Sequence, residues 1–410
     1  MIIVRAIRDA PFTERLKKDL TDELMLRVPR SDALLAVLLA SLPNLERLEI
    51  AIENPGLYLF LPREANLFER ALGTPAGVTA VYTDGQPDGQ RTLLPKLWQL
   101  KAEVAGDSPA GNIIALKQIV QLRKVTHFYG VRWSRPLRSP ANLHGDLSNL
   151  VYIELRECVF PNHVTERLFS GAFNLSTLIY QRGWNWNHDM THFVGTRSLR
   201  LALRPLGGTL TCLELSFNRS GRNSQETLFV RPINLWFLYC LKRLRISAGH
   251  LVTSARKEHM INRHHESFWD WEGTLNAGRP VRQLLPPRLE KLEIIQVEDR
   301  DEFNTLCDKL LSCLAYRASP EFNQTRELES LKEIVLEHQF EDQSPRLVKL
   351  HEAADRVGVK LITLHNCVES TTTGITRPVR ADKEIDWGFD REVKWKHPFI
   401  WKDEVVVKTP

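Results

Sequence analysis

The sequence has few cysteines and no long apolar run, and both absences restrict what the chain can be. Its six cysteines are scattered through 410 residues without a CxxC pair, which argues against a disulfide framework or a zinc finger. No segment offers the ~20 consecutive apolar residues of a membrane helix, and the residues from Met1 to Leu20 lack the apolar core of a secretory signal. We therefore expect reduced thiols, no membrane segment and a cytoplasmic or nuclear location.

An excess of charge of one sign is also missing. The chain has 55 Lys and Arg against 50 Asp and Glu, a formal net charge of +5, and the basic residues are mixed with acidic ones. Proteins that bind nucleic acids usually carry a clustered basic surface. The charge pattern therefore argues against nucleic acid as a partner.

Common catalytic and cofactor motifs are absent as well. There is no GxxxxGK[ST] or GxGxxG phosphate loop and no GxSxG nucleophile turn. The nearest approach to a metal site is the group His250, His259, His264 and His265, with a second pair at His188 and His192. Their spacings match no zinc motif, so we expect solvated histidines. The sequence predicts no enzyme activity, no metal and no cofactor.

One motif does recur: Leu, two residues, Leu, one residue, then Leu or Ile. Clear copies begin at Leu45, Leu150, Leu210, Leu241, Leu289 and Leu331, and weaker ones at Leu97, Leu122, Leu175 and Val359. From Leu97 onwards the starts are 25 to 48 residues apart. Leucine-rich repeats run ~20–29 residues, each with one short strand and a helical return. The longer units here require insertions.

A strand of this kind cannot bury its leucines alone, whereas stacked strands share one core. The expected fold is therefore α/β, a leucine-rich-repeat solenoid in which a curved parallel sheet carries helices on its convex side. The alternative is an ordinary α/β domain with coincidental leucines. We expect an N-terminal helical cap at 1–41 and the solenoid with insertions at 42–367.

The segments between strands carry helical signals. Apolar residues at Phe303, Leu306 and Leu310 are spaced for one face of a helix. Pro345 is placed to begin another helix and Gly358 to end it. The stretch that follows Ser31 predicts a further helix before the first strand.

The phrases LLAVLLASLPNLERLEI, LSNLVYIELRECVF, LTCLELSF and LPPRLEKLEI resemble the leucine-rich-repeat region of fungal F-box-type proteins, over about Asp32 to Cys367. In that family an F-box docks to a cullin-type ubiquitin ligase and the repeats hold the substrate. No LPxEL-type F-box segment precedes the repeats here, so the resemblance concerns the repeat region. It implies a protein-binding scaffold, the substrate-recognition region of a ligase adaptor, with cullin-ligase subunits as partners if an F-box lies upstream. The alternative is a scaffold without the box that uses the same solenoid for nucleic-acid or catalytic work.

The residues between the motif leucines are expected on the concave face, which is the usual binding surface of a solenoid. The predicted protein-binding residues are Arg47, Lys124, Tyr152, Glu154, Arg156, Gln181, Glu214, Arg243, Arg245, Lys291 and Glu293. Tyr and Arg are enriched in interfaces, which favours Tyr152, Arg156, Arg243 and Arg245. The alternation of Arg and Glu favours a protein partner over nucleic acid.

Beyond Cys367 the motif stops. Residues 368–385 read as a linker, and 386–410 form a tail with Trp387, Trp395 and Trp401. This tail is either a cap on the last repeats or a flexible arm that orders with a partner. Two further aromatic islands, at Trp184 with Trp186 and at Trp269 with Trp271, either anchor a partner or pack an inserted loop.

Overall fold

The computed structural model describes residues 2–10, 14–25, 31–53, 94–105, 111–112, 124–134, 147–160, 162–183, 196–217, 230–253, 275–297, 300–320, 322, 328–338, 340 and 344–365. The chain divides into a first unit, Met1–His365, which holds all of the described residues, and the remainder from Asn366, of which the structure describes none. The predicted linker, the predicted tail and both aromatic islands lie outside the described residues.

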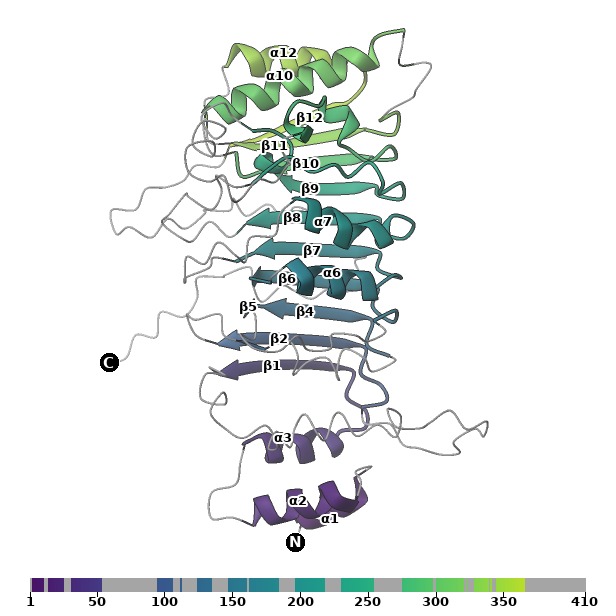
Figure 1. Ribbon diagram of the computed structural model, residues 1–410, viewed down its shortest axis with the longest axis vertical. Coiled ribbons are helices and arrows are strands. Elements are labelled where there is room, and N and C mark those ends of the chain that lie inside the picture. Colours follow the sequence, from purple (N-terminus) through teal and green to yellow (C-terminus); the bar gives the residue numbers. More distant parts are fainter. Residues whose placement is uncertain are drawn as a thin grey trace, which may run out of the picture. The chain divides into compact units, whose positions relative to one another are not determined.

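A ten-stranded parallel sheet organises the first unit, and its strands lie in chain order (Figure 1). They are β1 (Arg47–Glu53), β2 (Gln99–Ala105), β4 (His127–Val131), β6 (Tyr152–Cys158), β7 (Thr177–Arg182), β8 (Cys212–Phe217), β9 (Arg243–Ser247), β10 (Lys291–Ile295), β11 (Glu333–His338) and β12 (Lys360–His365). Two short strands, β3 (Gly111–Asn112) and β5 (Trp133–Ser134), form a separate pair. The predicted α/β class with a parallel sheet is confirmed.

The apolar residues of the motif align from strand to strand. The row at the second motif position is Leu48, Leu100, Phe128, Ile153, Leu178, Leu213, Leu244, Leu292, Ile334 and Leu361. From Leu100 to Ile334 this row is buried, whereas Leu48 and Leu361 are partly buried. The end strands have a neighbour on one side only, and this explains the difference. Each strand therefore completes its core with the strands beside it.

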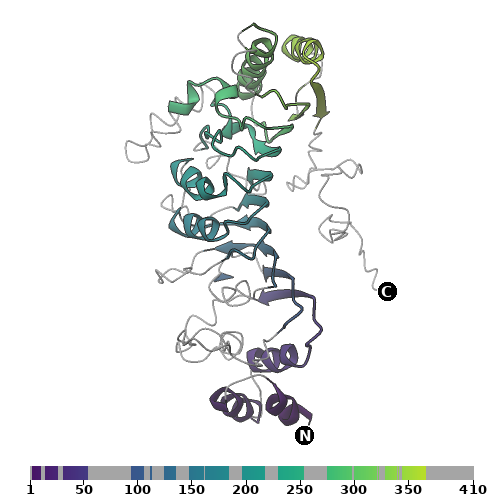
Figure 2. The same cartoon turned by 90° about the vertical axis from the view of Figure 1, so that its right-hand side faces the viewer.

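Helices cover one side of this sheet. Helices α6 (Asn162–Gly171) and α7 (Thr196–Leu203) lie on the same side of the strands (Figure 2). They place Leu168, Phe169 and Leu199 in the core. Alternate strand residues point away from that core, and we call the surface that they form the polar face.

Two predicted helices pack together near the C-terminal strands. Helix α10 (Arg300–Arg317) buries Phe303, Leu306 and Leu310, as its spacing predicts. Helix α12 (Pro345–Arg356) begins at Pro345, and Gly358 follows it with a φ of 69°. Glycine adopts this left-handed conformation without steric cost.

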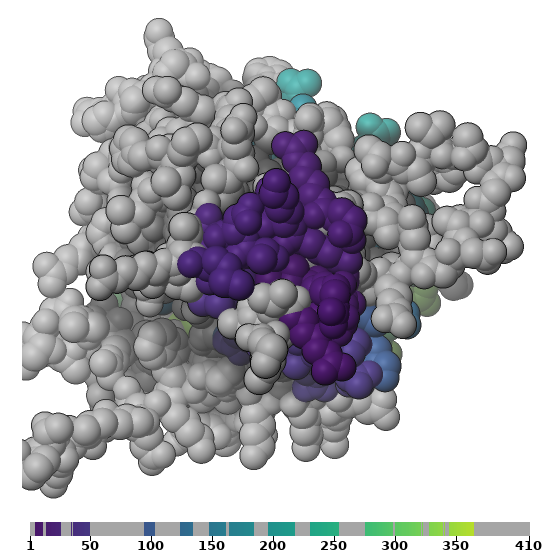
Figure 3. Space-filling view, turned by 90° about the horizontal axis from the view of Figure 1, so that it is seen from below, coloured from purple at the N-terminus to yellow at the C-terminus, as the bar shows by residue number. Residues whose placement is uncertain are grey.

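Three helices precede the sheet: α1 (Ile2–Asp9), α2 (Glu14–Leu24) and α3 (Ser31–Ala40). Figure 3 shows the side chains of this end of the chain gathered together. Ile7, Leu16, Leu20, Ala36 and Val37 form a small core of their own, and Leu39 of α3 belongs to the main core. The role of these helices as a cap stays a prediction.

For one motif, the predicted start lies three residues before the start that the sheet register gives. The motif assigned to Leu122 in fact begins at Val125, because Phe128 aligns with Leu100 and Ile153. Lys124 therefore lies, exposed, before β4 and not on the polar face, so its assignment to the binding face is wrong. Val125 fits an apolar motif position whether the motif begins at Leu122 or at Val125. Only the alignment that begins at Val125 gives Phe128 a buried position.

Candidate protein-binding face

The polar face carries a row of side chains that runs across all ten strands. The row is Glu49, Lys101, Tyr129, Glu154, Ile179, Glu214, Arg245, Glu293, Val335 and Ile362. Neighbouring positions in a parallel sheet are ~4.8 Å apart, so long charged side chains can reach one another. Apart from Lys124, every predicted binding residue lies on this face.

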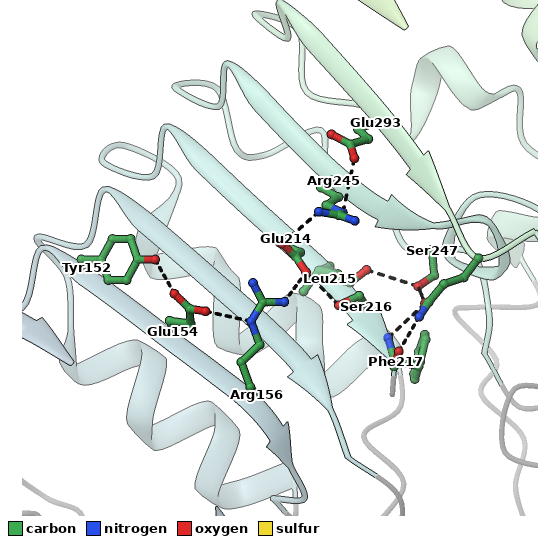
Figure 4. A network of polar contacts seen from close by, with 11 residues as sticks. Tyr152, Glu154, Arg156, Glu214, Leu215, Ser216, Phe217, Arg245, Ser247 and Glu293 are labelled. Atoms are coloured by element: carbon green, nitrogen blue, oxygen red, sulfur yellow. Dashed lines mark hydrogen bonds and ion pairs between the residues drawn. The ribbon is translucent and has the colours of Figure 1, made fainter. Parts of the chain in front are cut away.

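A polar network occupies the middle of the face (Figure 4). The Tyr152 hydroxyl donates to Glu154 Oε2 at 2.5 Å. Arg156 donates through Nε to Glu154 Oε1 at 2.8 Å and through Nη1 to Glu214 Oε1 at 2.7 Å. The guanidinium thus links β6 to β8 across the strand between them, and it fixes the position of both carboxylates.

Arg245 extends this network to a third carboxylate. Its Nη1 lies 4.0 Å from Glu214 Oε2, and its Nε lies 3.5 Å from Glu293 Oε1. Glu214 also accepts a hydrogen bond from the Ser216 hydroxyl at 3.0 Å. By contrast, neither carboxylate oxygen of Glu293 has a hydrogen-bond partner within the described part of the chain, although this residue is 2% exposed. The two acids beside Arg245 therefore have unequal surroundings.

Their pKa values shift in opposite directions. Burial on its own would raise the pKa of Glu214, but the positive charges of Arg156 and Arg245 outweigh it, and the pKa of this carboxyl is lowered. Burial raises the pKa of Glu293 to about 7, although Arg245 and Lys291 oppose the shift. Glu214 is consequently ionised at neutral pH, whereas Glu293 is partly protonated.

A second hydrogen-bonded group borders the network (Figure 4). The Phe217 amide donates to Gln296 Oε1 at 3.1 Å. The Gln296 side chain donates back to the Phe217 carbonyl and accepts from the Ser247 hydroxyl. This group ties the ends of β8 and β9 to the residue after β10.

Aromatic side chains form a column over the N-terminal strands. The ring centroids of Trp98 and His127 are 5.2 Å apart, those of His127 and Tyr152 are 5.5 Å apart and stacked, and those of Tyr129 and Tyr152 are 5.1 Å apart. The guanidinium of Arg47 lies 5.0 Å from the Trp98 ring centroid. We call Trp98, His127, Tyr129 and Tyr152 the aromatic column. Tyr152 belongs both to this column and to the polar network.

Beyond Glu293 the face becomes aliphatic. Ile295 and Val335 are buried, and Ile362 and Leu364 are partly buried. Lys291 pairs with Glu333 of the next strand at 2.6 Å. The three parts of the face therefore differ in chemistry: aromatic at β2–β6, ionic at β6–β10, and at β10–β12 a mixture of aliphatic side chains with the charged Lys291, Glu333 and Glu337.

The structure brings six of the predicted residues into one network: Tyr152, Glu154, Arg156, Glu214, Arg245 and Glu293. Arg47 and Lys291 contact other partners, and Arg243 is exposed. Gln181 lies on the same face, opposite Ser216. His127 and Tyr129 were missed because of the shifted repeat. The spacing from Val125 to Phe128, which equals that from Leu150 to Ile153, would have revealed them.

The described residues give little support to a metal site or to a reactive cysteine. In that part of the chain no three His, Cys, Asp or Glu side chains are grouped as metal ligands, and His250 contacts the ring of Phe217 at 5.1 Å. The remaining histidines of the two predicted groups lie outside it. Burial raises the pKa of the Cys212 and Cys307 thiols to about 12, so both stay protonated at neutral pH.

Of the helices that the structure describes, none combines the length and the apolar character needed to cross a bilayer. No protein-family model matches the chain, and no curated protein is significantly similar to it.

Proposed function

We propose that the chain is a leucine-rich-repeat protein that binds another protein on its polar face, as the substrate-recognition region of an F-box-type ubiquitin-ligase adaptor. The observation that carries the binding role is the pre-organised network of residues from β6, β8, β9 and β10, in which Arg156 holds Glu154 and Glu214. Side chains that are already fixed lose little conformational entropy when a partner arrives. The adaptor role rests on the resemblance of the repeat phrases alone.

The composition of the face supports a protein partner. Tyr and Arg dominate the energetic hot spots of protein interfaces, and Tyr152 joins the aromatic column to the network. Along the network, acidic and basic side chains alternate from Glu154 to Glu293. A nucleic-acid groove calls for an uninterrupted basic surface, so the alternation disfavours that alternative.

The experiment is affinity capture of the full chain from its source cells, followed by mass spectrometry. Arg243→Glu reverses an exposed charge on the face, and Tyr152→Ala removes the shared aromatic ring. The matched control is Arg197→Glu, an exposed Arg on helix α7. All variants are first compared with the wild type by circular dichroism and thermal melting.

We expect proteins that the wild type and the Arg197 variant retain and that both face variants lose. Cullin-ligase subunits among the captured proteins would support the adaptor role. Identical protein sets from all four chains would reject the polar face as the binding surface. A face-dependent set without ligase subunits would keep the binding role and reject the adaptor role.

A further inference from the structure

The charge balance of the polar network points to a bound proton. Two acids, Glu154 and Glu214, and two bases, Arg156 and Arg245, are joined by ion pairs of 2.7 to 4.0 Å. These four charges cancel. A third acid, Glu293, is attached to the same network through Arg245, and its ionisation would leave a net negative charge in a buried place.

The hydrogen bonds decide which acid holds that proton. Arg245 lies between Glu214 and Glu293. Glu214 receives hydrogen bonds from Arg156 and Ser216, and these stabilise its ionised form. Glu293 receives none from the residues that the structure describes and is 2% exposed, and burial without donors favours the neutral acid. The proton therefore belongs on Glu293.

The other charged groups around Glu293 do not change this assignment. Besides Arg245 and Glu214, the groups that act on it include Lys291 of its own strand and Glu337 of β11. The Cys212 thiol of β8 also interacts with Glu293, but it stays protonated at neutral pH. Lys291 is already paired with Glu333 at 2.6 Å. Glu337 and Glu214 are acids and favour the protonated form of their neighbour. The raised pKa of Glu293 agrees with the geometry.

We propose that the polar face is a proton-linked binding site: a partner segment that brings a positive charge over β9–β11 binds while Glu293 releases its proton to solvent. The inference rests on the proposed function and adds the chemistry of the partner. The new positive charge replaces the lost proton, so the network remains neutral in the complex. Val335 lies opposite Glu293 and is buried, and Ile362 lies opposite Val335 on the next strand and is partly buried. Ile362 therefore offers an apolar contact near Glu293 that suits an apolar group next to the basic residue of the partner.

The first test needs no partner. Full-length protein labelled with ¹³C at the Glu carboxyl carbon is titrated by NMR, and Glu293→Gln identifies the signal. The control is Glu290→Gln, which changes a more exposed Glu that is paired with Lys242 and Lys332. We expect one Glu signal with a midpoint near 7 that disappears in Glu293→Gln and persists in Glu290→Gln. A spectrum in which every Glu titrates near its ordinary value would overturn the proposal.

The second test uses a random peptide library displayed on phage as the probe. The library is panned against wild type at about pH 8, and the selected peptides are measured at about pH 8 and pH 6. We expect enrichment in Lys or Arg between apolar residues and roughly tenfold weaker binding per pH unit below neutrality, because one proton competes with the peptide. Peptides selected on Glu293→Gln should lose this pH dependence, and the Glu290→Gln protein should keep it.

Selection of neutral or acidic peptides, equal binding at both pH values, or no selection at all would reject the proton-linked site. The outcomes separate the two proposals. If cellular capture depends on the face but no Glu titrates near neutrality, only the further inference fails. If the titration succeeds but capture does not depend on the face, the proton exists and the proposed function fails.

Discussion

The guanidinium of Arg156 on β6 reaches over strand β7 and donates to the carboxylate of Glu214 on β8, at 2.7 Å. One side chain thereby spans about 10 Å, two strand spacings. Between Glu154 and Glu214 the register places Ile179, whose aliphatic side chain offers no competing hydrogen bond. A buried ion pair of this kind stabilises little by itself, but loss of one partner leaves the other charge uncompensated.

Removal of Arg156 should therefore be costly. We expect Arg156→Ala to lower the free energy of unfolding by about 1.5–3 kcal/mol, the usual worth of hydrogen bonds to charged groups. The measurement is urea unfolding followed by circular dichroism. In a double-mutant cycle with Glu214→Gln, the two changes should not be additive. Strict additivity would show that the two side chains do not interact in solution.

The protonation of Glu293 should appear in the pH dependence of stability. In the unfolded chain its pKa lies near 4.5, and in the folded protein it is about 7. Between these values the folded state holds a proton that the unfolded state has lost, so the free energy of unfolding falls as pH rises. Over this interval the loss attributable to Glu293 is at most about 3 kcal/mol.

Glu293→Gln should remove the contribution of Glu293 to the pH dependence of the unfolding free energy. The difference in unfolding free energy between the variant and wild type should move in favour of the variant between about pH 5 and pH 7.5. Glu214 affects stability in the opposite direction, because its pKa is lowered in the folded protein. Its ionised form stabilises the fold at neutral pH, and this stabilisation is lost as the pH falls through the acidic range. A difference that stays constant over the interval would contradict the assignment.

The aligned aliphatic row predicts a large effect of truncation. Leu213 is 1% exposed and lies between Leu178 and Leu244. Leu213→Ala should lower the free energy of unfolding by about 2–5 kcal/mol, because it removes buried methyl groups and leaves a cavity. Val348→Ala on α12, at a position that is 48% exposed, is the control and should change stability by less than about 0.5 kcal/mol. Equal effects at both positions would argue against the shared core.

Gly358 should resist replacement. Its φ of 69° costs a residue with a Cβ roughly 1–2 kcal/mol, and no atom lies within 4 Å of an added Cβ. Gly358→Ala should therefore destabilise the protein by about 1 kcal/mol through backbone strain alone. The control is Gly278→Ala, where an added Cβ also meets open space but φ is not positive. Thermal melting of the two variants therefore separates the cost of the positive φ from other effects of the added methyl group.

Much of the fold could be predicted because the motif leucines determine which side of each strand faces the core. Leu213, Leu244 and Leu292 align as expected, and Pro345 and Gly358 bound a helix in the predicted way. The exception is instructive. At β4 the core positions are Phe128 and Gly130, which do not match a leucine pattern.

Gly130 is a core residue for a reason that no local pattern reveals. An added Cβ would lie 2.9 Å from Leu155 Cδ2 and 3.2 Å from Trp133 Cδ1. The space that glycine leaves is taken up by its neighbours, and the Trp133 indole donates to the Ala102 carbonyl at 2.8 Å. These contacts join residues of different strands, so the sequence of a single repeat cannot predict them.

The residues of the polar face were predictable only as a set of candidates. Strand alternation identified Glu214 and Glu293 as residues of the same face, but their different states depend on donors from other strands. Arg156 comes from β6 and Arg245 from β9, and neither lies near Glu214 or Glu293 in the sequence. The different protonation of Glu214 and Glu293 could therefore be inferred only from the three-dimensional structure.

The register of the sheet has a consequence for how such a chain can change in evolution. The distance between successive motifs varies widely, yet opposite residues on β8, β9 and β10 keep the same alignment. Additions to the connections leave that alignment intact and cost little loop entropy. Loss of a single residue inside β9 would instead turn Arg245 inward and Leu244 or Ile246 outward. Diversity in this architecture should accumulate as longer connections, while the strands change by substitution alone.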